Sequence, residues 1–261
     1  MSAPLLVRRQ GAVGILELAR PDKFNCLSMA AWGAISTALA EFEQPGSGVR
    51  VILIQAQGKH FCTGADLDEV QGLRADATQL TEFIDCGHRV LRAMEDSPLP
   101  IVAACHGLCL AGGLELMLGC DMVFAADSAR FGDQHAQFGL IPGWGGSQRL
   151  TRLVGLRRAM DLYLSARWLD APTALAWGLV NDVVSEDALQ PHALSWCATA
   201  AERSAPGLAL MKRLARQGLD RPLTEALTLE AQLAVPALQS ADVNEGLAAF
   251  QARRKPVFQP R

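Results

Sequence analysis

Short apolar runs alternate with amphipathic segments along the first half of the chain. The runs, which are typical of buried strands, occupy Ala12–Leu18, Val49–Gln55, Ile101–Cys105 and Met122–Ala125. Helical spacing marks the segments between them, at Met29–Glu43 behind an N-capping Ser28, at Ala75–Asp96 and at Leu110–Gly119, and a loop is predicted over Gly58–Val70. Buried, mainly apolar strands that alternate with helices predict an α/β core with parallel pairing.

Almost everything after residue 145 has helical spacing. The predicted helices are Gly146–Leu153, Leu156–Ser165, Ala171–Trp177, Glu186–Ser204, Gly207–Gln217, Leu223–Leu238 and Val243–Arg253. A strand is predicted within this half at Leu179–Val184. The helical tail is rich in apolar residues for its length, so we expect it to pack on the core or on another subunit.

The composition favours a soluble globular protein. Of the 261 residues, 50% are hydrophobic and 20% charged, and the net charge of −3 does not indicate the basic surface of a nucleic-acid-binding protein. The seven cysteines lie in apolar segments, unlike the disulfide framework of a small secreted domain. No apolar stretch approaches a ~20-residue membrane span, and no signal-peptide run begins the chain. We therefore expect a cytoplasmic protein that binds neither nucleic acid nor membrane.

Two loops share one design, in which a buried strand leads into a small-residue turn that opens a helix. The turns are Thr63–Asp66 and Leu110–Gly113. The first amides of a helix lack backbone partners, and small residues let a ligand oxygen approach them. Two such turns facing each other would form an oxyanion hole. Tight packing of helix on strand would favour the same small residues, so both interpretations stand.

Glu115 lies within one turn of the second helix start, among apolar residues. Burial there would raise the pKa of its carboxyl, and such a group can hold water or exchange protons near neutral pH. The alternative is a first-turn acid favoured only by the helix dipole.

Other chemistries lack their motifs. Cys105, His106 and Cys109 form C-H-x-x-C, but no second cluster completes a metal shell, so no metal site is predicted. The sequence has no phosphate-binding loop, no dinucleotide-binding glycine motif, no G-x-S-x-G and no H-E-x-x-H. These absences argue against a nucleotide hydrolase, a nicotinamide enzyme, an elbow-type serine hydrolase and a zinc protease.

Motifs along almost the whole chain resemble the crotonase superfamily, the enoyl-CoA hydratase/isomerase family. The matching segments, in family order, are Leu18–Pro21 with Asn25, Phe61–Leu67, Ala104–Gly107, Ala111–Leu116, Cys120-Asp121, Ala129–Gly132, Gly139–Gly143, Gly146–Leu150, Ala174 with Gly178–Val180, and Glu245-Gly246 with Phe250, Arg254–Pro256 and Phe258.

The resemblance implies a core of spiral ββα turns over residues 1–200 and a C-terminal helical region, 201–261, that forms a homotrimer or a dimer of trimers. It implies an acyl-CoA thioester as the substrate, so that coenzyme A arrives with the substrate and neither a separate cofactor nor a metal is needed. The thioester oxygen would lie between the backbone N–H groups of Ala65 and Gly112.

The resemblance also implies where coenzyme A lies. Asp66, Leu67 and Asp68 would lie along its pantetheine and adenine. Lys23 and Phe24 would lie near its pyrophosphate.

Hydratases of the family add water across a 2,3-enoyl thioester with two glutamates, and this chain keeps only one. Glu115 stands at the first position and His135 at the second. A neutral imidazole accepts a proton and an imidazolium donates one, so His135 is predicted to replace the missing carboxylate, with Asp133 orienting its ring. The alternative is that His135 only fills space beside Trp144.

Trp144 stands in the glycine-rich turn Gly143–Gly146, where the family usually has a small residue. Its indole is predicted to contact the substrate, by shortening, flattening or capping the acyl pocket. Outward packing is the alternative.

The resemblance favours an enoyl-CoA hydratase, a lyase of fatty acid metabolism. The loss of the second glutamate leaves three alternatives open: an isomerase, a hydrolase that uses Glu115 and His135, and an acyl-CoA-binding protein without turnover. The sequence does not determine the acyl group.

Overall fold

Two β-sheets bring the strands of the first half together in the computed structural model, which describes residues 3–258. The larger sheet has the order β1-β2-β3-β4-β6-β9, with β1 Leu5–Gln10, β2 Val13–Leu18, β3 Val51–Ala56, β4 Ile101–Cys105, β6 Met122–Ala126 and β9 Asp182–Val184. The smaller has the order β5-β7-β8, with β5 Leu108–Leu110, β7 Arg130–Gly132 and β8 Leu169–Asp170. Met1, Ser2 and 259–261, which belong to the predicted core and tail, lie outside the described residues.

The predicted parallel pairing is confirmed for the larger sheet from β2 to β9, while β1 pairs with β2 in the antiparallel sense. Every residue of β3 and of β4 is buried, which explains why these strands are apolar at every position but Gln55. Successive chain segments give a strand to each sheet, as β4 with β5 and β6 with β7 do. This repetition is the spiral of ββα turns that the resemblance implies.

The larger helices lie close to their predicted positions. They are α1 Met29–Glu43, α3 Ala77–Asp96, α4 Gly112–Leu118, α5 Gly146–Val154, α6 Leu156–Ser165, α7 Ala171–Ala176, α8 Glu186–Ala201, α9 Ala205–Leu219, α10 Leu223–Leu238 and α11 Ala241–Gln251. Ser28 caps α1 as predicted, because its Oγ accepts from the amide of Ala31 at 3.2 Å.

The loop predicted over Gly58–Val70 is wrong for its last residues. Helix α2, Leu67–Leu73, begins there, and the side chain of Asp66 caps it by accepting from the amide of Glu69. A helix of seven residues is too short to show a clear hydrophobic period. The predicted strand Leu179–Val184 is also shorter in the structure, where only β9 is extended.

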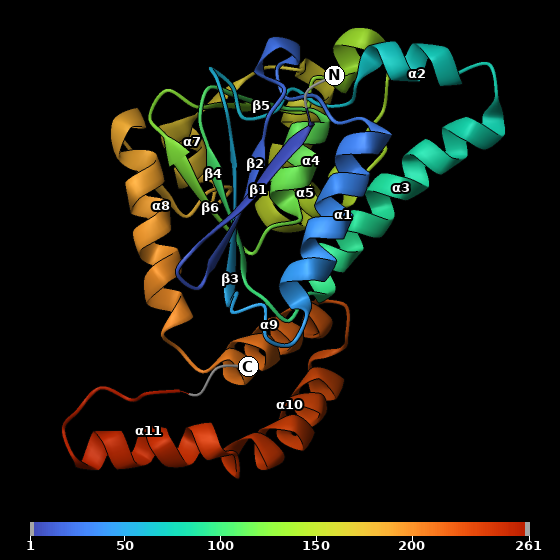
Figure 1. The fold of residues 1–261 in the computed structure, drawn as a ribbon. Helices are drawn as coiled ribbons and strands as arrows, with labels where there is room; N and C mark the ends of the chain where they lie inside the picture. Colours follow the sequence, from blue (N-terminus) through green and yellow to red (C-terminus); the bar gives the residue numbers. More distant parts are fainter. Residues whose placement is uncertain (1–2, 259–261) are drawn as a thin grey trace.

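Helices cover the two faces of the larger sheet differently (Figure 1). Side chains at Val13, Ile15, Val51 and Leu53 face α8, with whose Ala193 and Cys197 they form one buried cluster. The alternate positions on these strands face α1, α3 and α4 and form the larger cluster. The larger cluster packs around the residues that form the candidate site.

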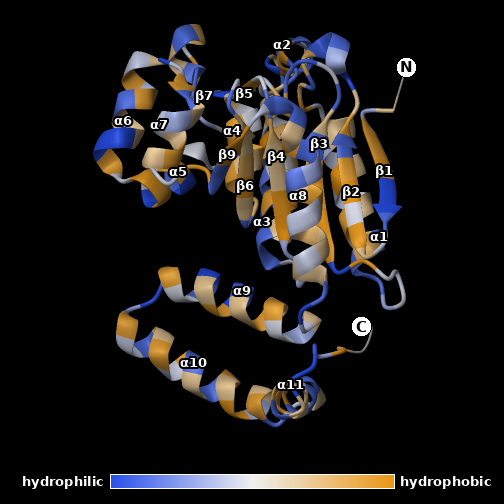
Figure 2. Ribbon diagram, turned by 90° about the vertical axis from the view of Figure 1, so that its left-hand side faces the viewer, coloured by the Kyte–Doolittle hydropathy of each residue, from blue (hydrophilic) through white to orange (hydrophobic). Residues whose placement is uncertain are grey.

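Helices α9, α10 and α11 form a separate layer below the sheet, with the described C-terminal end beside them (Figures 1 and 2). No residue of α10 is buried, and α9 and α11 bury only Ala205 and Ala249. Large apolar side chains are exposed on this layer, including Met211, Leu219, Leu223, Leu238, Leu247 and Phe250. Across residues 3–258, none of the helices is both long and apolar enough to cross a membrane.

Candidate active site

The two small-residue turns singled out in the sequence lie against each other. Cys62, just before the first turn, bonds to β5, since its amide donates to Leu108 O at 3.1 Å and its carbonyl accepts from Leu110 N at 3.0 Å. A Cβ added to Gly112 would lie 3.2 Å from the amide nitrogen of Ala65. Neither amide, that of Ala65 or that of Gly112, has an acceptor among residues 3–258. Two free N–H groups therefore lie side by side at the starts of α2 and α4.

The backbone just before Gly112 is strained. Ala111 has a φ of 49° and a ψ of −120°, a conformation that costs a non-glycine residue about 1–3 kcal/mol. Its amide is held by Gly132 O at 2.9 Å, which connects this turn to β7. The surrounding structure thus fixes the orientation of the peptide that carries the Gly112 N–H.

Glu115 is buried one turn into α4, with 1% of its surface exposed. Its Oε1 accepts from the amides of Trp144 and Gly146, each at 2.7 Å. Burial raises the pKa of this carboxyl, and the bonds from Gly146 and Trp144 and the nearby His135 offset only part of that effect. Oε2 accepts no hydrogen bond within the described chain and points to His135, whose Nε2 lies 3.9 Å away.

His135 is placed between two carboxylates. Its Nδ1 lies 3.0 Å from Asp133 Oδ1, without the alignment of a hydrogen bond, and its backbone amide donates to the same oxygen at 3.3 Å. Burial alone would lower the pKa of the imidazole, but Asp133 and then Glu115 raise it by more, so the pKa lies above its ordinary value of 6.5. The two carboxylates therefore make His135 easier to protonate than a free imidazole, and its Nε2 faces Glu115.

The residue before His135 fixes its backbone. Gln134 is buried and has a φ of 61°, in the left-handed region. Its side-chain amide donates to the carbonyl of Ala166, which itself has a φ of 49°. This anchored turn starts the short 3₁₀ helix η2, His135–Phe138.

Trp144 packs inward, with 2% of its surface exposed. Its ring lies edge-on to Trp32 at 5.0 Å and tilted against Phe83 at 5.2 Å, and Nε1 donates to the carbonyl of Phe83 at 3.4 Å. The alternative of outward packing is therefore wrong.

Sequence reasoning missed Arg149, which holds the turn whose Trp144 and Gly146 amides donate to Glu115. Its guanidinium donates to Trp144 O at 2.9 Å and forms a bidentate pair with Glu95 at 2.6 and 2.8 Å. Arg216 of α9 also reaches Glu95 at 3.4 Å, so a chain of ion pairs joins the site to the C-terminal layer. Glu115 and Arg149 contact the same turn but are 34 residues apart in the sequence, so no local motif connects them.

Tyr163 also supports this turn. Its hydroxyl donates to the carbonyl of Gly146 at 3.1 Å. Gly146, whose N–H binds Glu115, is therefore held through its carbonyl as well.

The predicted coenzyme A residues lie together at the mouth of the first turn. Lys23 and Asp68 are exposed and form an ion pair at 2.8 Å, and Leu67 is half exposed at the start of α2. Phe24, in the left-handed region with a φ of 51°, stacks on His60 at 5.5 Å.

Asp66, by contrast, has a structural role in addition to any contact with a ligand. It is buried and pairs with Arg20 at 3.0 Å. Burial opposes its ionisation, but bonds from Arg20, Cys26 and the Glu69 amide outweigh it and lower the pKa of Asp66.

The C-H-x-x-C segment is used for packing. His106 Nε2 lies 2.9 Å from the carbonyl of Gly58, and Cys105 and Cys109 are fully buried. In the described part of the chain, no three His, Cys, Asp or Glu side chains gather as a group that could hold a metal ion.

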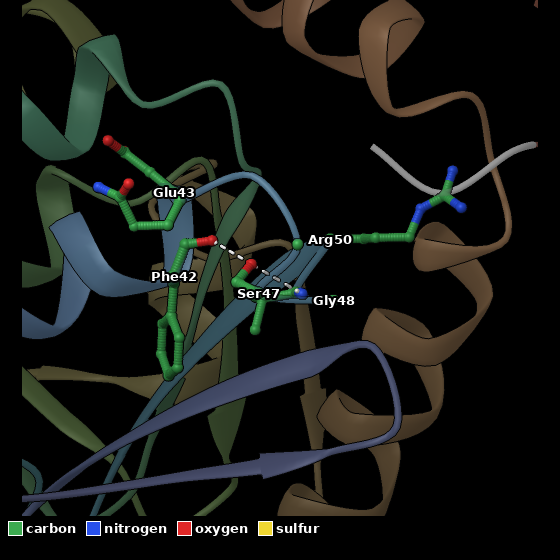
Figure 3. A pocket seen from close by; sticks show the side chains of 8 residues that line it. Phe42, Glu43, Ser47, Gly48 and Arg50 are labelled. Atoms are coloured by element: carbon green, nitrogen blue, oxygen red, sulfur yellow. Dashed lines mark hydrogen bonds between the residues drawn. The ribbon is translucent and has the colours of Figure 1, made fainter.

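Two surface hollows lie away from Glu115. One, of about 40 Å³, lies at the end of α1, where Ser47 Oγ donates to Phe42 O at 2.7 Å and accepts from Val49 N at 3.2 Å (Figure 3). The other is lined by Leu156, Arg157 and Met160. The first is too small for a CoA thioester, and neither is bordered by a residue of the candidate site.

Comparison with known proteins agrees with the motifs and the fold. The model of the enoyl-CoA hydratase/isomerase family matches residues 8–261. The chain is a member of this family. A probable enoyl-CoA hydratase of Rhizobium meliloti is 38% identical over 257 residues, which are 98% of each chain. One from Mycobacterium bovis is 37% identical over 258 residues, again 98% of each.

Solved structures of the enoyl-CoA hydratase/isomerase family confirm the fold. The crystal structure of an enoyl-CoA hydratase from Bacillus anthracis has a TM-score of 0.94 at 31% identity and covers 99% of this chain and 100% of that one. The crotonase-like α/β fold expected from the sequence is therefore correct, and the chain is related throughout its length to enzymes of this family.

Proposed function

We propose that the protein is an enoyl-CoA hydratase that uses Glu115 and His135 as its proton-transfer pair. The observation that carries the proposal is the geometry of Glu115. One carboxylate oxygen is saturated by two backbone donors at 2.7 Å, and the other faces His135 at 3.9 Å. A water molecule bound to that second oxygen would lie beside an imidazolium donor.

The thioester would be held by the two free amides. Its carbonyl oxygen accepts from Ala65 and Gly112, and both bonds strengthen as negative charge develops on that oxygen. Such a donor is worth about 3–4 kcal/mol in other enzymes. Coenzyme A extends from there towards Asp66–Asp68, which follow Ala65 in the chain, and towards Lys23 and Phe24, whose segment is joined to this turn by the bond from Thr63 N to Phe24 O at 3.2 Å.

Hydration then moves two protons and one hydroxide. Glu115 Oε2 takes a proton from water, and the hydroxide oxygen forms a bond to the β-carbon of the substrate. The π electrons of the double bond shift towards the thioester, giving an enolate that the amides of Ala65 and Gly112 stabilise. His135 Nε2–H donates its proton to the α-carbon, and the proton on Glu115 returns to the imidazole.

The raised pKa values suit these roles. A buried carboxyl whose pKa is raised is a stronger base than a free glutamate, and a histidine whose pKa is raised keeps its proton to higher pH than a free imidazole. The reaction moves only water and protons, so it needs neither a redox cofactor nor a metal ion.

Product analysis tests the proposal against its alternatives. Purified protein is incubated with straight, branched and aromatic 2-enoyl-CoAs over pH 6–9, and products are separated by mass and retention. We expect 3-hydroxyacyl-CoA from at least one substrate, and a loss of about 10²–10⁴-fold in Glu115→Gln. Glu82→Gln, an exposed acid of α3 that pairs with Arg89, is the control and should leave the rate unchanged.

Other products would identify the alternatives. Free CoA would show a hydrolase, and a shifted double bond an isomerase. A thermal shift with acyl-CoA but no product would show a binding protein without turnover.

We also propose that the chain forms a homotrimer or a dimer of trimers through α9–α11. The support is the exposed apolar side chains of that layer, among them Leu219 and Phe250, each 83% exposed. Monomeric proteins rarely expose apolar patches of this kind without a partner.

A further inference from the structure

The indole of Trp144 fills the space beside the amide donor Gly112. A Cβ added to Gly112 would lie 2.6 Å from Cζ3 of this ring, and one added to Gly87 on α3 would lie 2.4 Å from its Nε1. Real Cβ atoms essentially never approach other atoms closer than 3.0 Å. The ring is therefore clamped between two glycines on different helices, each of which leaves room for it only because it lacks a side chain.

Further contacts keep the ring from moving aside. Trp32 of α1 and Phe83 of α3 pack against it, and all three aromatic side chains are at most 2% exposed. The hydrogen bond from Nε1 to the carbonyl of Phe83 fixes the plane of the indole. Rotating the ring out would leave a large buried void, so its position is part of the packed core.

The indole also lies beside both proposed thioester donors. The point where a Cβ on Gly112 would stand is 2.6 Å from Cζ3 of the ring and 3.2 Å from the amide nitrogen of Ala65. The backbone amide of Trp144 donates to Glu115 Oε1 at 2.7 Å, so the same residue also contacts the proposed base. An acyl chain whose thioester oxygen binds these amides and whose reacting carbons lie near Glu115 therefore starts beside the indole.

We propose that Trp144, clamped by Gly87 and Gly112, restricts the protein to short-chain acyl thioesters. This inference rests on the proposed binding of acyl-CoA at Ala65 and Gly112. The indole occupies the space that methylenes beyond the reacting carbons would need, so these methylenes remain in water. They add no affinity, whereas each buried methylene would add about fourfold, the equivalent of ~0.8 kcal/mol.

Calorimetric titration with butyryl-, hexanoyl- and octanoyl-CoA tests this restriction. These saturated thioesters have no double bond to hydrate, so the result does not depend on turnover. We expect the wild-type affinity to stay level or fall as the chain lengthens. In Trp144→Ala the affinity should rise by about fourfold per added methylene until the freed space is full.

The control is Phe124→Leu, which truncates a buried aromatic side chain in the other core cluster, beside α8. It should lower the melting temperature, as Trp144→Ala does, without changing the chain-length series. Wild-type affinity that rises steeply with chain length would overturn the inference, even if Trp144→Ala did not fold. A folded Trp144→Ala whose series matches the wild type would overturn it as well.

Other results would contradict the proposed function. If none of the three thioesters binds, both the proposed acyl-CoA binding and the inference about Trp144 are wrong. If they bind with the expected series but enoyl-CoAs are not hydrated, the restriction by Trp144 stands and only the proposed reaction is lost.

Discussion

Two neighbouring carboxylates, Asp133 and Glu115, raise the pKa of His135. In the proposed mechanism Glu115 shares the proton transfer with His135, whereas Asp133 faces the other ring nitrogen, 3.0 Å away, and takes no part in the transfer. Together they outweigh burial and raise the pKa of His135. The imidazolium is therefore kept to higher pH than in a free histidine, and it loses its proton as the pH rises through the raised pKa.

Asp133→Asn should move the alkaline limb of the pH–rate profile to lower pH. The amide oxygen of asparagine still accepts from the His135 backbone, but the negative charge that favours the imidazolium is gone. The acid limb, which reports protonation of Glu115, should move much less, because Glu115 keeps both of its backbone donors. Profiles of kcat/KM for wild type and variant measure both limbs; an unmoved alkaline limb would contradict the role of Asp133.

Single residues were predictable where a local pattern expresses their chemistry. The turn before Gly112 and the acid at Glu115 follow from a helix that opens on small residues. The packing of Trp144 between Gly87 and Gly112 was not predictable, because Gly87 lies 57 residues earlier and meets the ring only through folding. Arg149 was missed for the same reason, since its partner Glu95 lies on another helix.

Among the elements, α9 is attached to the rest of the molecule mainly by buried charge. Lys212 is 7% exposed at its side chain, donates to Met94 O at 2.8 Å and Leu99 O at 3.0 Å, and pairs with Asp121 at 2.8 Å. It therefore satisfies carbonyls at and just after the end of α3. Burial is the main effect on the Lys212 pKa and lowers it.

Lys212→Met should reduce the free energy of unfolding by about 2 kcal/mol, because two carbonyls and part of the Asp121 charge lose their partner. Urea denaturation measures the change. Arg213→Met, at the next position of α9, removes an exposed cation that contacts only Gln217 of its own helix within the described residues, and should stay within about 0.5 kcal/mol of wild type. Equal effects of the two substitutions would contradict the docking role of Lys212.

Elements were predictable where their sequence pattern is clear. Helices α1, α6 and α10 have the predicted bounds because each repeats its pattern over several turns, and strand β4 does because it is an unbroken apolar run that follows a proline. Strands β5, β7 and β8 have two or three residues and no detectable period. Strand β1 was missed because five of its six residues are exposed on the edge of the sheet.

For the whole molecule, the C-terminal layer predicts self-association. Light scattering during gel filtration should give three or six times the chain mass of 28.0 kDa. Phe250→Asp places a charge on an exposed apolar side chain of α11 and should shift the mass towards monomer. Asp242→Asn, on the same helix, is a surface control that should not. A monomeric wild type would contradict the proposed assembly.

The rate of crotonyl-CoA hydration by two His135 variants tests the central claim most directly. The claim is that this imidazolium supplies the proton that a second glutamate supplies elsewhere in the family. His135→Glu, which offers a proton from a carboxyl at the same place, should lose no more than about tenfold. His135→Gln, which has no proton to transfer, should lose about 10²–10⁴-fold while keeping its fold and its affinity for butyryl-CoA. A wild type that leaves crotonyl-CoA unchanged, or a glutamine variant as fast as wild type, would contradict it.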